Sequence, residues 1–212
     1  MNPTSPANAP PGAPPQQAVP LWHRHALPAV IAAASLIIML SGEKGELWLR
    51  YDREAILAGE WWRLVTAHLC HLGWSHLAMN LAGLALIWAL FHRFFTTGGW
   101  LAVTLVSALA VGLGLLAFNP EIQWYVGLSG VLHGLFLAGL LASLFAGYRL
   151  EWLLFLLVVA KLAWEQRYGA LPGSADLAGG AVVVDAHFYG ALAGSATALL
   201  LRLPKSARPA GR

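Results

Sequence analysis

Six runs of apolar residues, each long enough or nearly long enough to cross a lipid bilayer, restrict the fold of this chain more than any other feature. The runs cover about residues 26–41, 76–95, 99–118, 128–147, 150–164 and 186–203. Spanning takes roughly 20 apolar residues, or somewhat fewer when flanking side chains reach the interface. Charged residues make up 11% of the chain, against roughly 25% in soluble domains. We therefore predict an all-α, polytopic membrane protein with six transmembrane helices.

The runs divide the chain into three parts. Residues 1–25 carry seven prolines among their first 20 positions and are expected to form a disordered tail. Residues 26–203 are expected to form one membrane domain, and residues 204–212 a basic tail. A long first loop, residues 42–75, holds half of the acidic residues and four tryptophans: Trp48, Trp61, Trp62 and Trp74. Because tryptophan prefers the interface, we expect this loop to lie partly in the headgroup layer.

Charge predicts the orientation of the spans. With six spans both termini lie on one side, where the charged side chains sum to +6, whereas those of the other side sum to −3. The positive-inside bias therefore places both termini in the cytoplasm. The basic residues are scattered, so nothing indicates a nucleic-acid partner. Cys70 is the only cysteine, which excludes an intrachain disulfide and a CxxC site.

Four polar residues stand near the starts of the second, fourth and sixth runs: His76, Asn80, Ser129 and His187. Polar groups at such positions are expensive in a membrane and are usually functional. These three runs all cross from the outer to the inner side, so their first turns should share one layer just below the outer surface. A serine, two histidines and an amide in one layer indicate nucleophilic acyl chemistry.

Ser129 and His187 are the candidate nucleophile and base, because a serine hydroxyl is a weak nucleophile until a base takes its proton. Glycines that would let two helices approach closely flank both residues: Gly127, Gly130 and Gly134 near Ser129, and Gly190 and Gly194 after His187. Glycine beside the nucleophile also allows tight backbone geometry at a helix start. The alternative is a packing seam with an incidental histidine.

His76 and Asn80 are four residues apart, so on a helix both side chains point the same way. Neutral donors of this kind suit an oxyanion hole, together with the backbone N–H of Ser129. The alternative is a hydrogen-bonding pair between helices.

Other polar residues have supporting or open roles. His133 follows Ser129 by one turn and could pack against His187, while His71 is expected to brace the first loop. Asp185 has two interpretations at this point: an acid that orients His187, or an acid of the surface loop. His68, His71 and His76 show no HExxH motif and no accompanying cysteine or carboxylate cluster, so no metal site is predicted.

Taken together, these residues resemble the rhomboid intramembrane serine proteases over roughly residues 40–203. The matching pieces in chain order are Trp62-Arg63, His71, His76, Asn80, Gly127-Leu128-Ser129-Gly130, and Ala186-His187 with Gly190 and Gly194. The resemblance implies a six-helix rhomboid-like bundle without a cofactor. It also implies a Ser129–His187 dyad without a third acid, and an oxyanion hole made by His76, Asn80 and the Ser129 amide.

His133 stands where a tyrosine is usual in that family, and Gly-Leu-Ser-Gly-Val-Leu-His-Gly is similar to the rhombosortase subgroup. That resemblance implies an endopeptidase for transmembrane proteins whose C-terminal anchor has a glycine-rich motif, one helix and a basic end. It further implies a multi-pass protein of the bacterial inner membrane, with its active site facing the periplasm.

Two other functions compete with this one. A proton-coupled transporter would use the histidines as relays, but it would need polar residues across the whole bilayer, and these runs are polar at one end only. An inactive rhomboid-like protein that binds membrane clients would lack the nucleophile or the base, yet Ser129 and His187 are both present.

Overall fold

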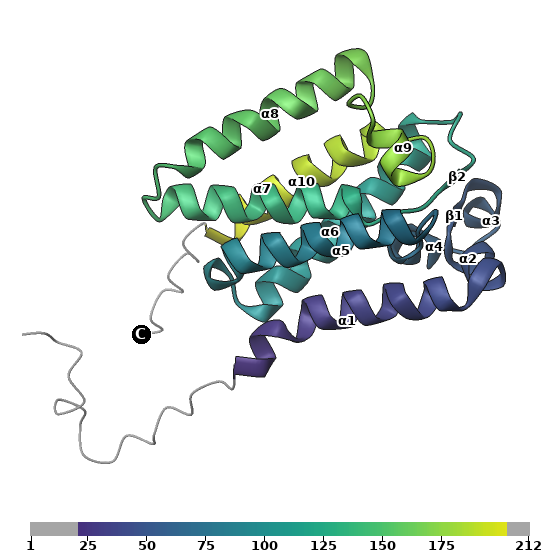
Figure 1. The fold of residues 1–212 in the computed structure, drawn as a ribbon, viewed down its shortest axis with the longest axis horizontal. Helices are drawn as coiled ribbons and strands as arrows, with labels where there is room; N and C mark the ends of the chain where they lie inside the picture. Colours follow the sequence, from purple (N-terminus) through teal and green to yellow (C-terminus); the bar gives the residue numbers. More distant parts are fainter. Residues whose placement is uncertain (1–20, 203–212) are drawn as a thin grey trace, which may run out of the picture.

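The computed structural model describes residues 21–202, which contain one long helix for each predicted run (Figure 1). These helices are α1 (Leu21–Leu40), α5 (Trp74–Phe91), α6 (Thr97–Phe118), α7 (Ser129–Phe145), α8 (Glu151–Tyr168) and α10 (Val184–Arg202). The prediction of a mainly helical chain is confirmed. By length and composition, two described helices could cross a membrane: α6, and α5 with the 3₁₀ turn η3 (His92–Phe94). Residues 1–20 of the expected N-terminal tail, and the whole expected C-terminal tail 204–212, lie outside the described residues.

Two described helices, α1 and α8, extend four or five residues beyond the runs that predicted them. α1 begins at Leu21, inside the segment expected to be a tail, and so includes the basic patch that precedes the apolar run. α8 continues to Tyr168 rather than stopping near residue 164. The charge of Glu165 does not end α8 because this side chain is buried and forms an ion pair with Lys161, one turn earlier.

The long first loop consists of short helical pieces: α2 (Gly42–Leu49), α3 (Arg53–Leu57), α4 (Arg63–Thr66) and the 3₁₀ turn η2 (Ala67–Leu69). The buried guanidinium of Arg63, at the start of α4, binds the end of α2, because its Nη1 donates to the carbonyl oxygens of Leu47 at 2.8 Å and Arg50 at 2.9 Å. Its Nε forms an ion pair with Glu60. The loop is therefore ordered around one buried cation.

A short antiparallel strand pair departs from the all-α prediction. β1 (Tyr51–Asp52) pairs with β2 (Trp124–Tyr125), with Tyr51 opposite Tyr125. Both tyrosines are buried. The pair joins the first loop to the segment that leads into α7, and so it fixes where α7 begins.

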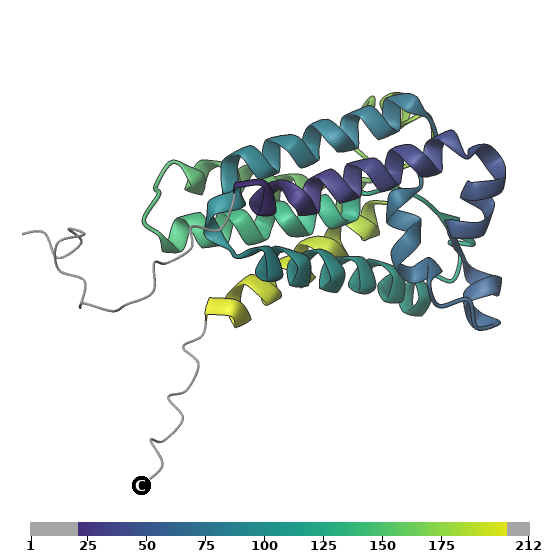
Figure 2. The same cartoon turned by 90° about the horizontal axis from the view of Figure 1, so that it is seen from below.

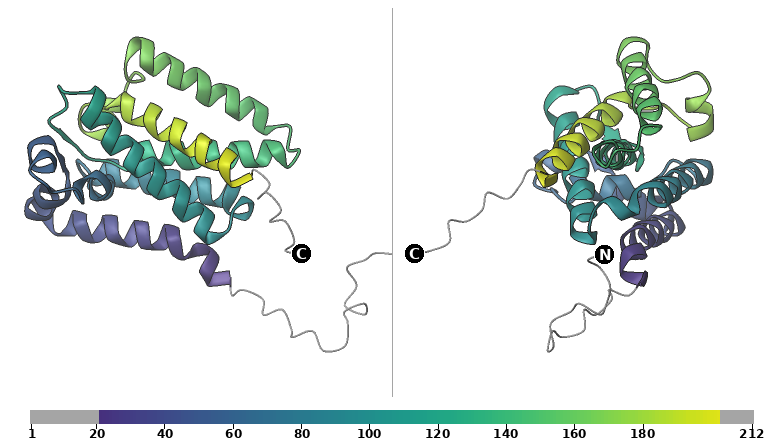
Figure 3. Two further views of the ribbon diagram at one scale, coloured as in Figure 1. Left: turned by 180° about the vertical axis from the view of Figure 1, so that it is seen from behind. Right: turned by 90° about the vertical axis from the view of Figure 1, so that its left-hand side faces the viewer.

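α7 lies in the middle of the bundle, with α5, α6, α8 and α10 around it (Figure 3). α10 approaches it most closely: a Cβ added at Gly190 would collide with the carbonyl oxygen of Gly130, and one added at Gly194 with that of Gly134. The predicted close approach of two glycine faces is therefore confirmed between α7 and α10. It brings the backbones of α7 and α10 into direct contact.

The first residues of α5, α7 and α10 lie at one end of the bundle, beside the first loop and the strand pair (Figures 1 and 2). The start of α1 and the end of α10 lie at the opposite end. Because α5, α7 and α10 run in the same direction, their first turns reach one layer. That layer holds the polar residues singled out in the sequence.

Candidate active site

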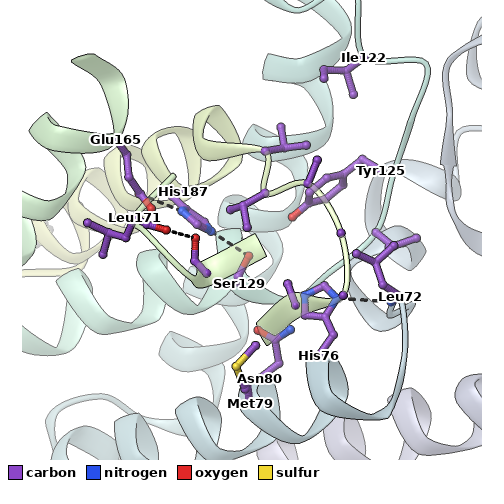
Figure 4. A pocket seen from close by; sticks show the side chains of 18 of the residues that line it. Leu72, His76, Met79, Asn80, Ile122, Tyr125, Ser129, Glu165, Leu171 and His187 are labelled. Atoms are coloured by element: carbon purple, nitrogen blue, oxygen red, sulfur yellow. Dashed lines mark hydrogen bonds and ion pairs between the residues drawn. The ribbon is translucent and has the colours of Figure 1, made fainter. Parts of the chain in front are cut away.

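A cavity of about 870 Å³ lies at this end of the bundle. Its wall contains His76, Asn80, Ser129 and His187, so the four residues from three separate helices face one space (Figure 4). Much of the remaining wall is apolar and comes from residues 121–126 and 178–183. The second of these segments begins at the last residue of the short helix α9 (Ser174–Ala178). Ligand pockets typically measure roughly 300–1,000 Å³, so this cavity can hold a ligand of several residues.

Ser129 and His187 lie within hydrogen-bond distance across the contact between α7 and α10. The Oγ of Ser129, the first residue of α7, is 3.0 Å from Nε2 of His187, the fourth residue of α10. With Nε2 accepting from the hydroxyl, the ring proton belongs on Nδ1. This arrangement suits transfer of the hydroxyl proton to the imidazole. The glycine contacts between the helices make the distance possible.

His76 and Asn80 supply donors to the same cavity. Nδ1 of His76 accepts a hydrogen bond of 3.3 Å from the backbone N–H of Leu72, which assigns the ring proton to Nε2. Asn80 is 5% exposed, and its Nδ2 has no hydrogen-bond partner. A buried amide without a partner is rare because it costs free energy. Its N–H groups are available to an acceptor in the cavity.

Gly127 allows the backbone to pass close to His76. Its φ is +128°, and a Cβ there would lie 2.9 Å from Cε1 of the imidazole. Its carbonyl oxygen accepts from the Tyr125 hydroxyl at 2.9 Å and lies 3.3 Å from Nδ1 of His68. Burial raises the pKa of Tyr125, so its hydroxyl stays protonated and remains a donor. Sequence reasoning gave no role to Tyr125 or His68 in holding this turn.

His71 lies behind the cavity wall. Its Nδ1 is 3.1 Å from the carbonyl oxygen of Leu69, and its ring meets the ring of His76 edge-on, with 5.0 Å between centroids. Burial lowers the pKa of His71 to about 4, and the neighbouring His76 adds to the shift. His71 is therefore neutral near pH 7 and supports the imidazole of His76.

α8 brings two charged residues to the site that the sequence analysis did not assign to it. Oε2 of Glu165 is 3.0 Å from Nδ1 of His187, and Nζ of Lys161 is 2.8 Å from the same oxygen. His133 stacks on His187, with 4.2 Å between centroids and 21° between ring planes. The sequence contains one signal for this pair: Lys161 and Glu165 are four residues apart at the end of an apolar run, where charged residues are usually functional.

Asp185 does not contact His187, although it precedes it by two residues. Its carboxylate accepts instead from Nδ2 of Asn119 at 2.8 Å and from Nε2 of Gln166 at 3.2 Å. Asn119 also accepts from the hydroxyl of Tyr189 at 2.9 Å. The acid beside the imidazole is therefore Glu165 rather than Asp185, and the expected absence of a third acid does not describe this structure.

Comparison with known proteins gives a family match over most of the chain. The family model described as "Rhomboid domain" matches residues 58–204, which include every residue of the cavity described above. The chain is 35% identical over 78 residues to the putative rhomboid protease YdcA of Bacillus subtilis (strain 168), covering 37% of this chain and 39% of that protein. It is 30% identical over 83 residues to the rhomboid protease GluP of the same organism, covering 39% of this chain and 16% of that protein. The aligned stretch spans well under half of each relative.

Proposed function

The chain belongs to the rhomboid family of membrane proteins, and from this premise we propose that it is an intramembrane serine endopeptidase. Ser129 is the nucleophile and His187 the general base. The observation that carries this proposal is the 3.0 Å distance between Oγ and Nε2, in the wall of a cavity large enough for a peptide.

The reaction follows from the positions of these two groups. Ser129 Oγ attacks the scissile carbonyl carbon while its proton passes to Nε2 of His187. The imidazolium then gives this proton to the leaving amine nitrogen, the C–N bond breaks, and an ester remains on Ser129. Water hydrolyses the ester by the same route, with His187 again accepting and returning a proton.

The oxyanion that forms during the attack needs donors that are already in place. His76 offers Nε2–H, Asn80 offers its unpartnered amide, and Ser129 offers its backbone N–H at the start of α7. The free N–H groups of a helix start also favour negative charge. Each donor that is aimed at the transition state lowers the barrier more than it stabilises the bound substrate.

We further propose that all six long helices cross the membrane. Large apolar side chains on α1, α6, α8 and α10 are exposed, as lipid contact would require; examples are Ile37, Leu113, Leu156 and Leu200. The two described ends of the chain lie at the end of the bundle opposite the cavity. The charge distribution supports termini in the cytoplasm and a cavity facing the periplasm of a bacterial inner membrane.

The proposed substrates are transmembrane proteins with a glycine-rich, C-terminal tail anchor. The apolar wall of the cavity suits a segment leaving a membrane, and glycine lowers the cost of unwinding the substrate helix before cleavage. His133 in place of tyrosine favours a rhombosortase-like enzyme, which removes such sorting tails. No cofactor takes part in this scheme.

The test uses Ser129→Ala and His187→Ala in cells that carry a tagged tail-anchored substrate. Both variants should stop processing, whereas Ser195→Ala should not, because the Ser195 hydroxyl bonds to the Ala191 carbonyl within its own helix. Continued cleavage of the substrate by Ser129→Ala or by His187→Ala would contradict the proposal. A serine-directed fluorophosphonate separates the alternatives, because a transporter or an inactive binding protein would not be labelled at Ser129.

A further inference from the structure

The carboxylate of Glu165 is placed where it can fix the proton of the proposed base. Its Oε2 is 3.0 Å from Nδ1 of His187, and its side chain is 3% exposed. Since Nε2 of His187 accepts from Ser129, Nδ1 carries the ring proton and donates it to this oxygen. The three side chains therefore form one continuous line of hydrogen bonds from α7 through α10 to α8.

Lys161 balances the charge of this buried acid. Its Nζ donates to Oε2 of Glu165 at 2.8 Å and to Nε2 of His133 at 2.7 Å. Nδ1 of His133 in turn donates to the carbonyl oxygen of Ser129 at 2.7 Å. Lys161 thus holds both the acid behind His187 and the ring stacked on it.

The ammonium also occupies the position that a metal ion would need. One ligand atom from each of His133, Glu165 and His187 lies within 4.8 Å of the others, which is close enough for a shared ion. Nζ of Lys161 lies 2.7 to 3.3 Å from an atom of each of these residues. The cluster already contains its cation.

We propose that Glu165 is a positioning residue that turns the Ser129–His187 pair into a Ser–His–Glu triad, with Lys161 setting the charge balance. This inference rests on the proposed function. At rest the Lys161–Glu165 pair is neutral and His187 is uncharged. When Ser129 attacks, the imidazolium and the oxyanion form together, so the site stays neutral overall, and Glu165 faces the new positive charge.

Other groups near His187 do not take this role. His76 on α5 approaches from the opposite wall, Asp185 on α10 bonds elsewhere, and the α6 segment contains no titratable side chain. His133 on α7 presents its ring face to the imidazole. The carboxylate of Glu165 and the ammonium of Lys161 are therefore the charges that act on His187 from the side of Nδ1.

The first experiment measures phosphonylation of Ser129 in the full-length protein, as a function of pH. Glu165→Gln should lower the rate by up to roughly 10⁴-fold, the loss that follows when the acid of a serine-protease triad is neutralised. Glu165→Asp should restore part of the loss. Glu151→Gln, the same change in the first turn of α8, is the control and should leave the rate within twofold.

The pH profile separates a charge effect from a structural one. Glu165→Gln removes the negative charge that favours the imidazolium, so the acidic limb of the profile should move to lower pH. Lys161→Met removes the opposing positive charge, so the limb should move to higher pH. Opposite shifts support the proposal, whereas shifts in the same direction, or none, would overturn it.

Three further measurements keep the result decisive. If either single variant fails to fold, the double variant Lys161→Met with Glu165→Gln removes both charges together. The acidic limb of its pH profile should lie between those expected for the two single variants. Full wild-type activity of the double variant would refute the triad. Loss of wild-type activity on adding a metal chelator would also refute it, in favour of a metal site. If Ser129→Ala still reacts, the proposed function itself fails, independently of Glu165.

Discussion

Replacing Asn80 with leucine should change activity and stability in different directions, because the amide donates to nothing in the resting protein. The side chain is 5% exposed, and Nδ2 is buried without a partner. A buried donor without an acceptor costs about 1–3 kcal/mol. Leucine has a similar volume and no polar atoms, so the free energy of unfolding should stay the same or rise by about 1 kcal/mol.

The same substitution removes one donor to the oxyanion. Loss of such a donor costs about 2.7–4 kcal/mol of transition-state stabilisation, which corresponds to roughly 10²–10³-fold in rate. We therefore expect Asn80→Leu to be well folded and nearly inactive. This combination distinguishes a catalytic donor from a hydrogen bond that holds two helices together, since loss of the latter would lower stability.

The assay pairs two measurements on the detergent-solubilised protein: the rate of fluorophosphonate labelling at Ser129, and the free energy of unfolding. Thr197→Val is the control because it also removes a buried polar atom; its hydroxyl bonds to the Ala193 carbonyl at 2.8 Å within α10, and Thr197 does not line the cavity. A fall in rate of less than about threefold would refute the reasoning, as would a fall explained by unfolding.

Three other substitutions test the scaffold around the site. Gly190→Ala should lower the free energy of unfolding by about 1–3 kcal/mol or more, because its Cβ meets the Gly130 carbonyl oxygen; Gly98→Ala, whose Cβ would have only one neighbour at 4.0 Å, should not destabilise in the same thermal denaturation series. His71 has its pKa lowered to about 4, so the folded state holds fewer protons than the unfolded state between about pH 6.5 and 4. Stability should fall by up to about 3 kcal/mol as the pH drops through that window, and His71→Leu should flatten this slope in unfolding measured against pH. Arg63→Lys should lose the paired contacts to two carbonyl oxygens and lower stability by about 2–3 kcal/mol; limited proteolysis should then cut within residues 42–62, and an unchanged digest would contradict this role.

Span counting and helical spacing predict much of the site from the sequence alone. Apolar runs set the six helices, and their alternating direction predicted that His76, Ser129 and His187 meet in one layer. Glycine spacing predicted the contact between α7 and α10. These features are local or periodic, so a single sequence contains them.

The parts that sequence reasoning missed depend on contacts between distant segments. The fifth predicted span ends near residue 164, but α8 continues to Tyr168, and Glu165 lies buried against His187 on another helix. The pairing of Tyr51 with Tyr125 joins segments 74 positions apart, and two-residue strands leave no alternating pattern. Asp185 is two residues from His187 in sequence, yet its carboxylate accepts a hydrogen bond from Asn119, the residue that follows α6.

The position of α8 has a consequence for how the site could fluctuate. Among its 18 residues only Leu162 and Glu165 are buried. Phe155 and Val158 pack against the core while partly buried, so α8 has a small apolar interface, to which the polar contacts of Glu165 add. Segments with few buried apolar contacts open at low free energy. Each excursion of α8 away from the bundle would carry Glu165 away from His187 and leave the imidazole free to rotate. Local hydrogen exchange in this helix and the reactivity of Ser129 should therefore follow one shared equilibrium, which the surrounding lipid can shift.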